Sequence, residues 1–232
     1  IRDAPAFDCI LLDFQMPKMN GVEVCRAVRL IDGYDQTPVV MLTAMSEKRY
    51  IDAAFLAGAT DYINKPFEIS DLRVRLGVIS SLVAARRESG MILSPISSGD
   101  QASVASTPLS LYQPFEIRDI EGVVDVVALE NYVSKLSRSR LFGSSVFAVS
   151  IRRIEQLFMQ ITPFDFQCML VDVAEALSDT LGSQNFIAAY AGSGSFVGVV
   201  EGSKIYNYPE FTDRLNLAIQ RLEMHCSTGA PL

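Results

Sequence analysis

Histidine and cysteine are scarce in this chain, which removes several classes of active site. A single histidine, His225, rules out a histidine-rich metal site and leaves little room for a Ser-His-Asp triad. The four cysteines lie far apart, without CxxC or CxxH spacing, so they favour free thiols in a reducing cytosol. We therefore expect a cytoplasmic location.

Long apolar runs and an excess of positive charge are also missing. No uninterrupted apolar stretch approaches the roughly 18 residues that cross a bilayer, so we expect no membrane span. The 20 basic residues are outnumbered by 27 acidic ones, and this net charge of −7 argues against coating nucleic acid or an anionic membrane. Apolar residues make up 49% of the 232 positions, enough for one large domain or two small ones.

A change of composition divides the chain in two. Residues 89–114 hold seven serines, three prolines and two glycines but only one charge, as expected of a flexible linker. The flanking domains are then 1–88 and 115–232.

Residues 1–88 alternate short apolar runs with helical periodicity. This order predicts an α/β fold with a parallel sheet and right-handed crossovers, and such sheets place their sites at the carboxyl ends of the strands. The expected strands are 8–13, 38–43 and 60–64, and the expected helices are 21–31, 46–57 and 70–87.

Asp13, Thr43 and Lys65 each stand at the carboxyl end of one expected strand, so they should converge. A carboxylate there is a candidate nucleophile or ligand for a hard cation. A lysine neutralises charge on a transferred phosphoryl group, and a threonine hydroxyl bonds one of its oxygens. Taken singly, each residue has an ordinary interpretation: Asp13 as an acidic residue of a turn, Thr43 as a hydroxyl at a strand end, and Lys65 as a charge in solvent.

The surrounding motifs make the combination more specific. They are Leu-Leu-Asp13-Phe-Gln15-Met-Pro17-Lys-Met-Asn-Gly21, Leu-Thr43-Ala44, and Gly58-Ala-Thr-Asp-Tyr62-Ile-Asn-Lys65-Pro66-Phe67. Together they closely resemble the receiver domain of two-component response regulators, a flavodoxin-like, doubly wound fold. The resemblance covers residues 1–88.

The resemblance implies that Asp13 is the catalytic phosphoacceptor, served by a sensor histidine kinase or a phosphotransfer protein. It also implies Mg²⁺, held by the Asp13 carboxylate and the backbone carbonyl of Gln15. Thr43 and Tyr62 match the family's switch pair and Lys65 its invariant lysine. Pro17, Gly21 and Pro66 match structural positions of the motifs.

The family begins with a strand that ends in two metal-binding acidic residues, and no such pair precedes Asp13. We therefore expect this sequence to be part of a longer gene product whose receiver domain lacks here its first two strands and two helices. Without the acidic pair, Mg²⁺ binding and phosphoryl acceptance should be weak.

Residues 115–232 predict a second α/β domain, with helices at 126–136, 168–181 and 211–224 and strands at 144–151, 186–190 and 195–200. Their order resembles the GGDEF (diguanylate cyclase) family, an α+β, nucleotidyl-cyclase-like fold. The hairpin Gly192-Ser193-Gly194-Ser195-Phe196 sits where that family has its signature. We expect this domain to be cut at its C-terminal end, within a strand after Met224.

The chemistry of that family is missing from the second domain. Ser150-Ile-Arg152 replaces the metal-binding Asp-x-Asp, and residues 183–200 contain neither Asp nor Glu. We therefore expect a degenerate module without catalysis. A phosphate-binding loop at Gly192–Gly194 is a weaker alternative to a plain turn. Phe158, Met159 and the Met and Phe residues of 164–169 are expected in the core rather than in a cofactor site.

The sequence as a whole favours a response regulator in which phosphoryl acceptance at Asp13 controls a non-catalytic GGDEF-like interaction module. The helix at 70–87 is the expected contact for a homodimer. Two alternatives stay open: an active diguanylate cyclase, or the regulatory part of a larger cyclic-di-GMP phosphodiesterase.

Overall fold

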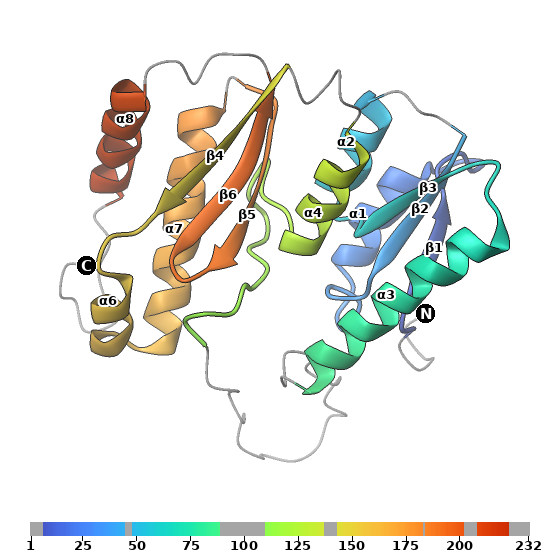
Figure 1. Ribbon diagram of the computed structural model, residues 1–232, viewed down its shortest axis with the longest axis horizontal. Helices are drawn as coiled ribbons and strands as arrows, with labels where there is room; N and C mark the ends of the chain where they lie inside the picture. The colour runs from blue at the N-terminus through green and yellow to red at the C-terminus, as the bar shows by residue number, and fades with distance from the viewer. Residues whose placement is uncertain are drawn as a thin grey trace. The chain divides into compact units, whose positions relative to one another are not determined.

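The chain folds into two compact units, Ile1–Thr107 and Pro108–Leu232 (Figure 1). The computed structural model describes residues 7–44, 48–88, 110–136, 143–182, 184–201 and 208–222. Each unit has its own sheet, so each is described by itself.

The first unit is a parallel three-stranded sheet with one helix after each strand. The strands lie in the order β1-β2-β3, and every pairing is parallel. This confirms the alternation of strands and helices that the apolar runs predicted. The elements are β1 (Ile10–Asp13), α1 (Gly21–Arg29), β2 (Val39–Thr43), α2 (Lys48–Leu56), β3 (Asp61–Asn64) and α3 (Ile69–Glu88).

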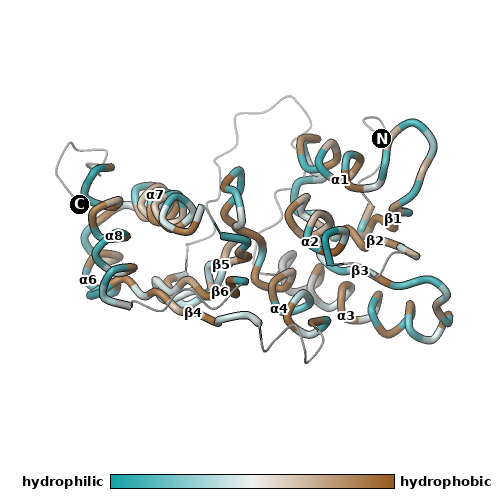
Figure 2. Tube along the Cα trace, turned by 90° about the horizontal axis from the view of Figure 1, so that it is seen from above, coloured by the Kyte–Doolittle hydropathy of each residue, from teal (hydrophilic) through white to brown (hydrophobic). Residues whose placement is uncertain are grey.

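Helices cover both faces of this sheet. Helices α1 and α2 lie on one side and α3 on the other (Figure 2). Val40 and Ile63 of the sheet pack against Ile79 and Val83 of α3 in one buried cluster. The central strand β2 is almost wholly buried because both of its faces are covered, which explains its continuous apolar run.

The start of α1 is fixed beside the end of β1. The Asn20 side chain accepts a hydrogen bond from the Glu23 N–H, and the Glu23 carboxylate accepts one from the Asn20 N–H, both at 3.0 Å. This reciprocal capping box satisfies two amide groups that the first helical turn leaves without partners. The Gly21 N–H donates to the Phe14 carbonyl at 2.9 Å, so the first turn of α1 sits directly against the chain that follows Asp13.

The second unit combines an antiparallel sheet with helices. Its strands lie in the order β4-β6-β5, and β5 and β6 form the predicted hairpin. The sequence did not predict the short helix α6. The elements are α4 (Val126–Lys135), β4 (Ser144–Ser150), α6 (Ile154–Gln160), α7 (Pro163–Leu181), β5 (Phe186–Gly192), β6 (Ser195–Glu201) and α8 (Tyr208–Arg221).

Helix α7 is the centre of the second core. Thr162 caps it by accepting a hydrogen bond from the Asp165 N–H, and Pro163 occupies the first turn, where its missing N–H costs nothing. Leu170, Ala174 and Leu177 are completely buried against the sheet. The apolar stripe of α7 therefore holds the unit together.

The core of the second unit includes a residue from the expected linker, 89–114. Leu111 is 6% exposed and belongs to the second core, and its carbonyl accepts a hydrogen bond from the Ser193 N–H at 2.7 Å. The Ser- and Pro-rich composition of this segment did not reveal Leu111 as an apolar anchor. The strand expected after Met224 lies outside the described residues.

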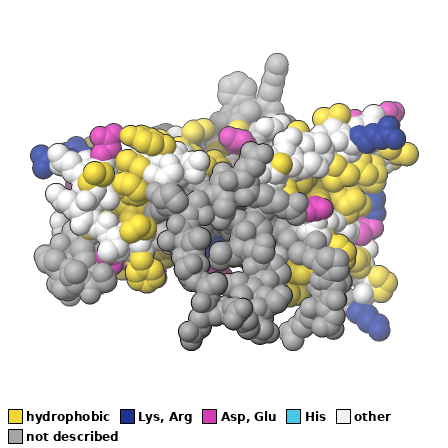
Figure 3. All heavy atoms as spheres, turned by 90° about the horizontal axis from the view of Figure 1, so that it is seen from below, with side chains coloured by type: hydrophobic (Ala, Val, Ile, Leu, Met, Phe, Trp, Pro, Cys, Tyr) yellow, Lys and Arg dark blue, Asp and Glu magenta, His cyan; other side chains and the backbone are white. Residues whose placement is uncertain are grey.

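Two of the large side chains expected in the second core are on the surface instead. Met159 is 83% exposed and Phe164 is 69% exposed, whereas Phe166 is buried. Met159 lies on the solvent side of α6, and Phe164 lies in the first turn of α7, outside the buried stripe of that helix. Hydrophobic side chains also reach the visible surface of both units in the space-filling view (Figure 3).

Candidate functional site

The ends of the three parallel strands bring the predicted site residues to one edge of the first sheet. Asp13 is the last residue of β1 and Thr43 the last of β2, and Lys65 follows β3 directly. Register pairs Asp13 with Leu42 and Thr43 with Asn64. The Lys65 N–H also donates to the Thr43 carbonyl at 2.6 Å, which continues the ladder past β3.

Asp13 and Lys65 form an ion pair at this edge. The Lys65 ammonium donates to one oxygen of the Asp13 carboxylate, and the Gln15 N–H donates to the other at 3.2 Å. The two side chains are 40% and 37% exposed. The carboxylate is thus oriented from two sides and still open to a reactant from solvent.

The Lys65 ammonium is the main reason why the pKa of Asp13 lies below its ordinary value, and the Gln15 N–H lowers it further. The ion pair therefore exists above the ordinary pKa of an aspartate and is lost as pH falls through the lowered one.

We predict that Lys65→Met moves the titration midpoint of Asp13 upward, towards the ordinary value. The physical reason is the loss of the cation that stabilises the charged form. The ¹³C chemical shift of the Asp13 carboxyl, followed against pH, measures the midpoint. An unchanged midpoint would mean that the ion pair is absent in solution.

Thr43 and Tyr62 lie below the surface of the same region. Thr43 is 3% and Tyr62 4% exposed. The Tyr62 ring meets the Phe55 ring of α2 edge-on, with centroids 6.0 Å apart. In this state the Tyr62 ring is part of the packing between β3 and α2.

The remaining motif residues shape the loops around Asp13 and Lys65. The Lys65–Pro66 peptide bond is cis, in line with a defined turn after Lys65. Pro17 begins a tight turn, because its carbonyl accepts a hydrogen bond from the Met19 N–H at 3.0 Å. Gly21 is buried against the Asp13 carbonyl, where a larger residue has no room.

The described residues supply only part of a magnesium site. Mg²⁺ takes about six oxygen ligands, commonly one or two carboxylates together with water and phosphate. In the ranges that the structure describes, no group of three His, Cys, Asp or Glu side chains comes together. Asp13 offers one carboxylate, and the part expected of the Gln15 carbonyl stays a prediction.

Sequence reasoning missed a buried ion pair next to Tyr62. The Asp61 carboxylate accepts hydrogen bonds from Arg75 of α3 and from the Tyr62 N–H at 2.8 Å. Asp61 is only 4% exposed, so its charge is satisfied inside the fold. The signal in the sequence that could have indicated this ion pair was an aspartate within an apolar strand.

The glycine-rich hairpin of the second unit makes hydrogen bonds of its own. Gly192, Ser193 and Gly194 have positive φ angles, which turn successive N–H groups into the loop. The Ser193 N–H already donates to the Leu111 carbonyl, and the Gly194 N–H donates to the Tyr190 hydroxyl at 3.1 Å. These two donors are used internally, which favours a plain turn over the phosphate-binding alternative for this loop.

A pair of hydroxyl groups stands at the base of the hairpin in the second unit. Ser195, the first residue of β6, lies opposite Ser150, the last residue of β4, and their hydroxyls are 2.9 Å apart. The next residue, Phe196, is fully buried and packs against the Tyr190 ring. The hairpin therefore serves the packing of the core, with a neutral pair of hydroxyls at its base.

Among the described residues, no helix is long and apolar enough to cross a membrane.

Comparison with known proteins finds a family match and relatives for part of the first unit. Residues 2–77 match the family model of the response regulator receiver domain. The response regulator ArlR of Staphylococcus aureus is 40% identical over 73 residues, which are 32% of this chain and 32% of ArlR. The chain thus covers about a third of the length of the curated relatives that it matches.

Solved receiver structures also show similarity to part of the chain. The BeF₃-activated DrrB receiver domain is 32% identical, with 34% of this chain and 67% of that one covered and a TM-score of 0.32. The chemotaxis protein CheY4 of Vibrio cholerae is 36% identical, with 32% and 61% covered and a TM-score of 0.31. The C-terminal region has no family assignment.

Proposed function

We propose that the receiver domain at residues 2–77 accepts a phosphoryl group on Asp13 from a sensor histidine kinase or a phosphotransfer protein. The observation that carries the proposal is the open Asp13 carboxylate, held by Lys65 where three parallel strands end. An Asp13 oxygen bonds to phosphorus while the bond from phosphorus to the donor's imidazole nitrogen breaks. The imidazole keeps that electron pair, and the nearby Lys65 ammonium offsets the charge of the transferred group.

The structural effect of phosphorylation would be passed to the surface through Thr43 and Tyr62. The modification adds negative charge and acceptor oxygens beside the buried Thr43 hydroxyl. A shift of Thr43 towards these oxygens changes the space beside Tyr62, whose ring packs on α2. The face made by β3 and α3 then changes shape, as in other two-state switches.

A second copy of this chain is the proposed partner for that face. Helix α3 exposes Ile69, Val74 and Val78, each by more than 60% of its surface. Exposed apolar side chains on one helix are a common feature of protein interfaces. Dimerisation on phosphorylation would cover them.

The second unit is proposed as a non-catalytic GGDEF-like interaction module. Its order of elements, with a β5–β6 hairpin in an antiparallel sheet, is compatible with that family. A cyclase needs carboxylates that hold two cations against the triphosphates of GTP. The paired hydroxyls of Ser150 and Ser195 and the carboxylate-free hairpin favour an interaction role over cyclase activity.

We predict that the full-length gene product gains the mass of one phosphoryl group when it is treated with acetyl phosphate and Mg²⁺. Asp13→Asn removes the nucleophilic carboxylate and should abolish the gain in intact-protein mass spectra. Asp71→Asn, at an exposed aspartate in the first turn of α3, is the matched control and should leave it unchanged. A mass gain that survives Asp13→Asn would refute the assignment.

A further inference from the structure

Helix α2 is held by two aromatic contacts that come from the sheet. The Phe14 ring meets the Tyr50 ring in the first turn of α2 edge-on, with centroids 5.3 Å apart and planes at 79°. The Tyr62 ring meets Phe55 further along the same helix at 6.0 Å and 84°. One contact thus begins at the residue after Asp13, and the other begins in β3.

The main chain of Phe14 has little freedom to move independently of Asp13. Its N–H donates to the Leu42 carbonyl at 2.8 Å, and its carbonyl accepts from the Gly21 N–H at 2.9 Å. Both hydrogen bonds are made by the main chain of the residue that directly follows Asp13, so a shift of Asp13 displaces Phe14. Because the ring of Phe14 rests on Tyr50, that displacement is passed to α2.

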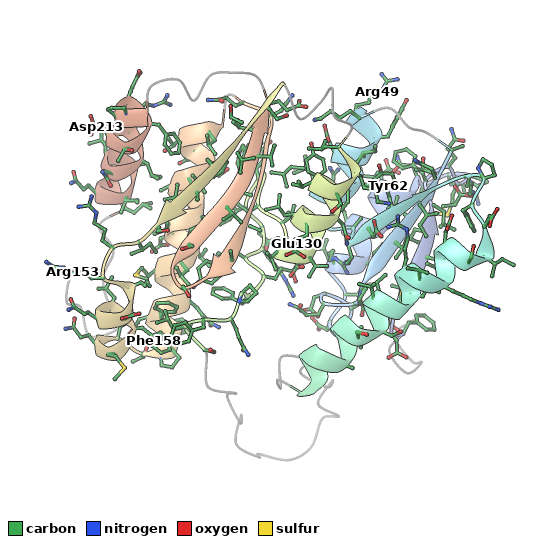
Figure 4. The ribbon with its side chains drawn as sticks, viewed as in Figure 1. Arg49, Tyr62, Glu130, Arg153, Phe158 and Asp213 are labelled. Atoms are coloured by element: carbon green, nitrogen blue, oxygen red, sulfur yellow. The ribbon has the colours of Figure 1, made fainter. Side chains whose placement is uncertain are left out.

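The neighbouring Arg49 steadies the Tyr50 ring. The guanidinium carbon lies 4.7 Å from the centroid of the ring, and an Arg49 N–H donates to the Tyr50 hydroxyl at 2.9 Å. A cation over an aromatic face is attracted by the electrons of the ring. Arg49 itself extends from α2 to the outside of the unit (Figure 4).

From these contacts we propose that Tyr50 is a positioning residue: through Phe14 it holds the backbone of Asp13 in place and couples the state of Asp13 to α2. The part of the proposal that concerns phosphoryl transfer rests on the proposed function. Without the Tyr50 ring, the segment around Asp13 has more freedom, and α2 loses its contact with the acceptor strand.

The coupling is tested first without any phosphodonor. The measured quantity is the effect of Asp13→Asn on the amide hydrogen exchange of residues 48–56. It is measured in three proteins: with Tyr50 unchanged, with Tyr50→Phe and with Tyr50→Ala. We expect Asp13→Asn to change the protection of α2 with Tyr50 or Phe at this position and to leave it unchanged with Ala. No effect of Asp13→Asn in the wild-type background, or an equal effect in Tyr50→Ala, overturns the proposal.

The second measurement is the rate of phosphoryl acceptance from acetyl phosphate by the full-length gene product. Tyr50→Ala should lower the rate by about tenfold, because small misplacements of a reacting group are costly, and Tyr50→Phe should retain it. The matched control is Phe158→Ala in the second unit. It removes a similar edge-on contact with the Phe166 ring, in which the centroids are 4.9 Å apart. It should change neither the hydrogen exchange of α2 nor the rate of phosphoryl acceptance. An unchanged rate in Tyr50→Ala overturns the positioning role.

Two further checks address a variant that fails to fold and a wild-type protein that is not phosphorylated. If Tyr50→Ala fails to fold by circular dichroism, Tyr50→Leu replaces it, because leucine fills part of the volume without offering a ring. If the wild-type protein takes up no phosphoryl group, the proposed function fails, whereas the exchange measurement still decides whether Tyr50 couples Asp13 to α2.

Discussion

Gly21→Ala is expected to damage both the stability of the first unit and its reaction at Asp13. A β-carbon at position 21 would collide with the main-chain carbonyl of Asp13 and would lie 2.8 Å from the Met41 side chain. Met41 is flexible, but the carbonyl belongs to β1 and cannot rotate away. Either α1 or the end of β1 must therefore shift.

Such overpacking costs about 1–3 kcal/mol of unfolding free energy. Urea denaturation followed by circular dichroism measures this loss, and intact-protein mass spectra after acetyl phosphate treatment measure the reaction. We expect a lower denaturation midpoint and a slower mass gain, because the Asp13 backbone is displaced.

The matched control is Gly77→Ala in α3. Apart from the adjacent residues and backbone of its own helix, nothing lies within 4 Å of a β-carbon built at position 77, and alanine favours a helix over glycine by up to about 1 kcal/mol. This variant should be as stable as the wild type or more so. If Gly21→Ala also leaves stability and reaction unchanged, the close approach of α1 to the Asp13 carbonyl does not exist in solution.

Leu177→Ala is expected to have the largest effect on the second unit. Leu177 is completely buried in α7 and belongs to the core that joins this helix to the sheet. Truncating a buried leucine to alanine costs about 2–5 kcal/mol, since it loses apolar contact and leaves a cavity. A loss of this size is a large fraction of the stability of an ordinary domain.

Hydrogen exchange read separately for each unit is the appropriate measurement. The amides of α7, β5 and β6 should lose protection in Leu177→Ala, whereas those of β1 to β3 should keep theirs, because the two units have separate cores. Glu175→Ala changes an exposed side chain of the same helix and should shift stability by no more than about 0.5 kcal/mol. Equal loss of protection in both units would show that they unfold as one.

The sheet of the first unit was predictable because burial leaves a direct trace in sequence. A parallel strand covered on both faces must be apolar throughout, and the run that ends at Thr43 has that form. Strand ends in such a sheet lie at one edge. The meeting of Asp13 with Lys65, 52 positions apart, follows from these two rules.

The contacts around α2 could not be predicted in the same way. Phe14 and Tyr50 are two ordinary aromatic residues 36 positions apart, and no local pattern links them. Asp61 was visible as a charge in an apolar strand, but its partner Arg75 was not. Side-chain pairs across elements depend on helix rotation and rotamers, which sequence periodicity does not specify.

By itself, the sequence determined the order of the strands and helices in the first unit, the polar residues at its strand ends and the absence of carboxylates from the second hairpin. Each is a matter of local composition and spacing. Only the tertiary structure decided that Leu111 anchors in the second core, that the donors of Ser193 and Gly194 are already used, and that Tyr50 meets Phe14. The contacts of Leu111 with Ser193 and of Tyr50 with Phe14 join residues distant in the chain, and close packing of the elements settles which of them meet.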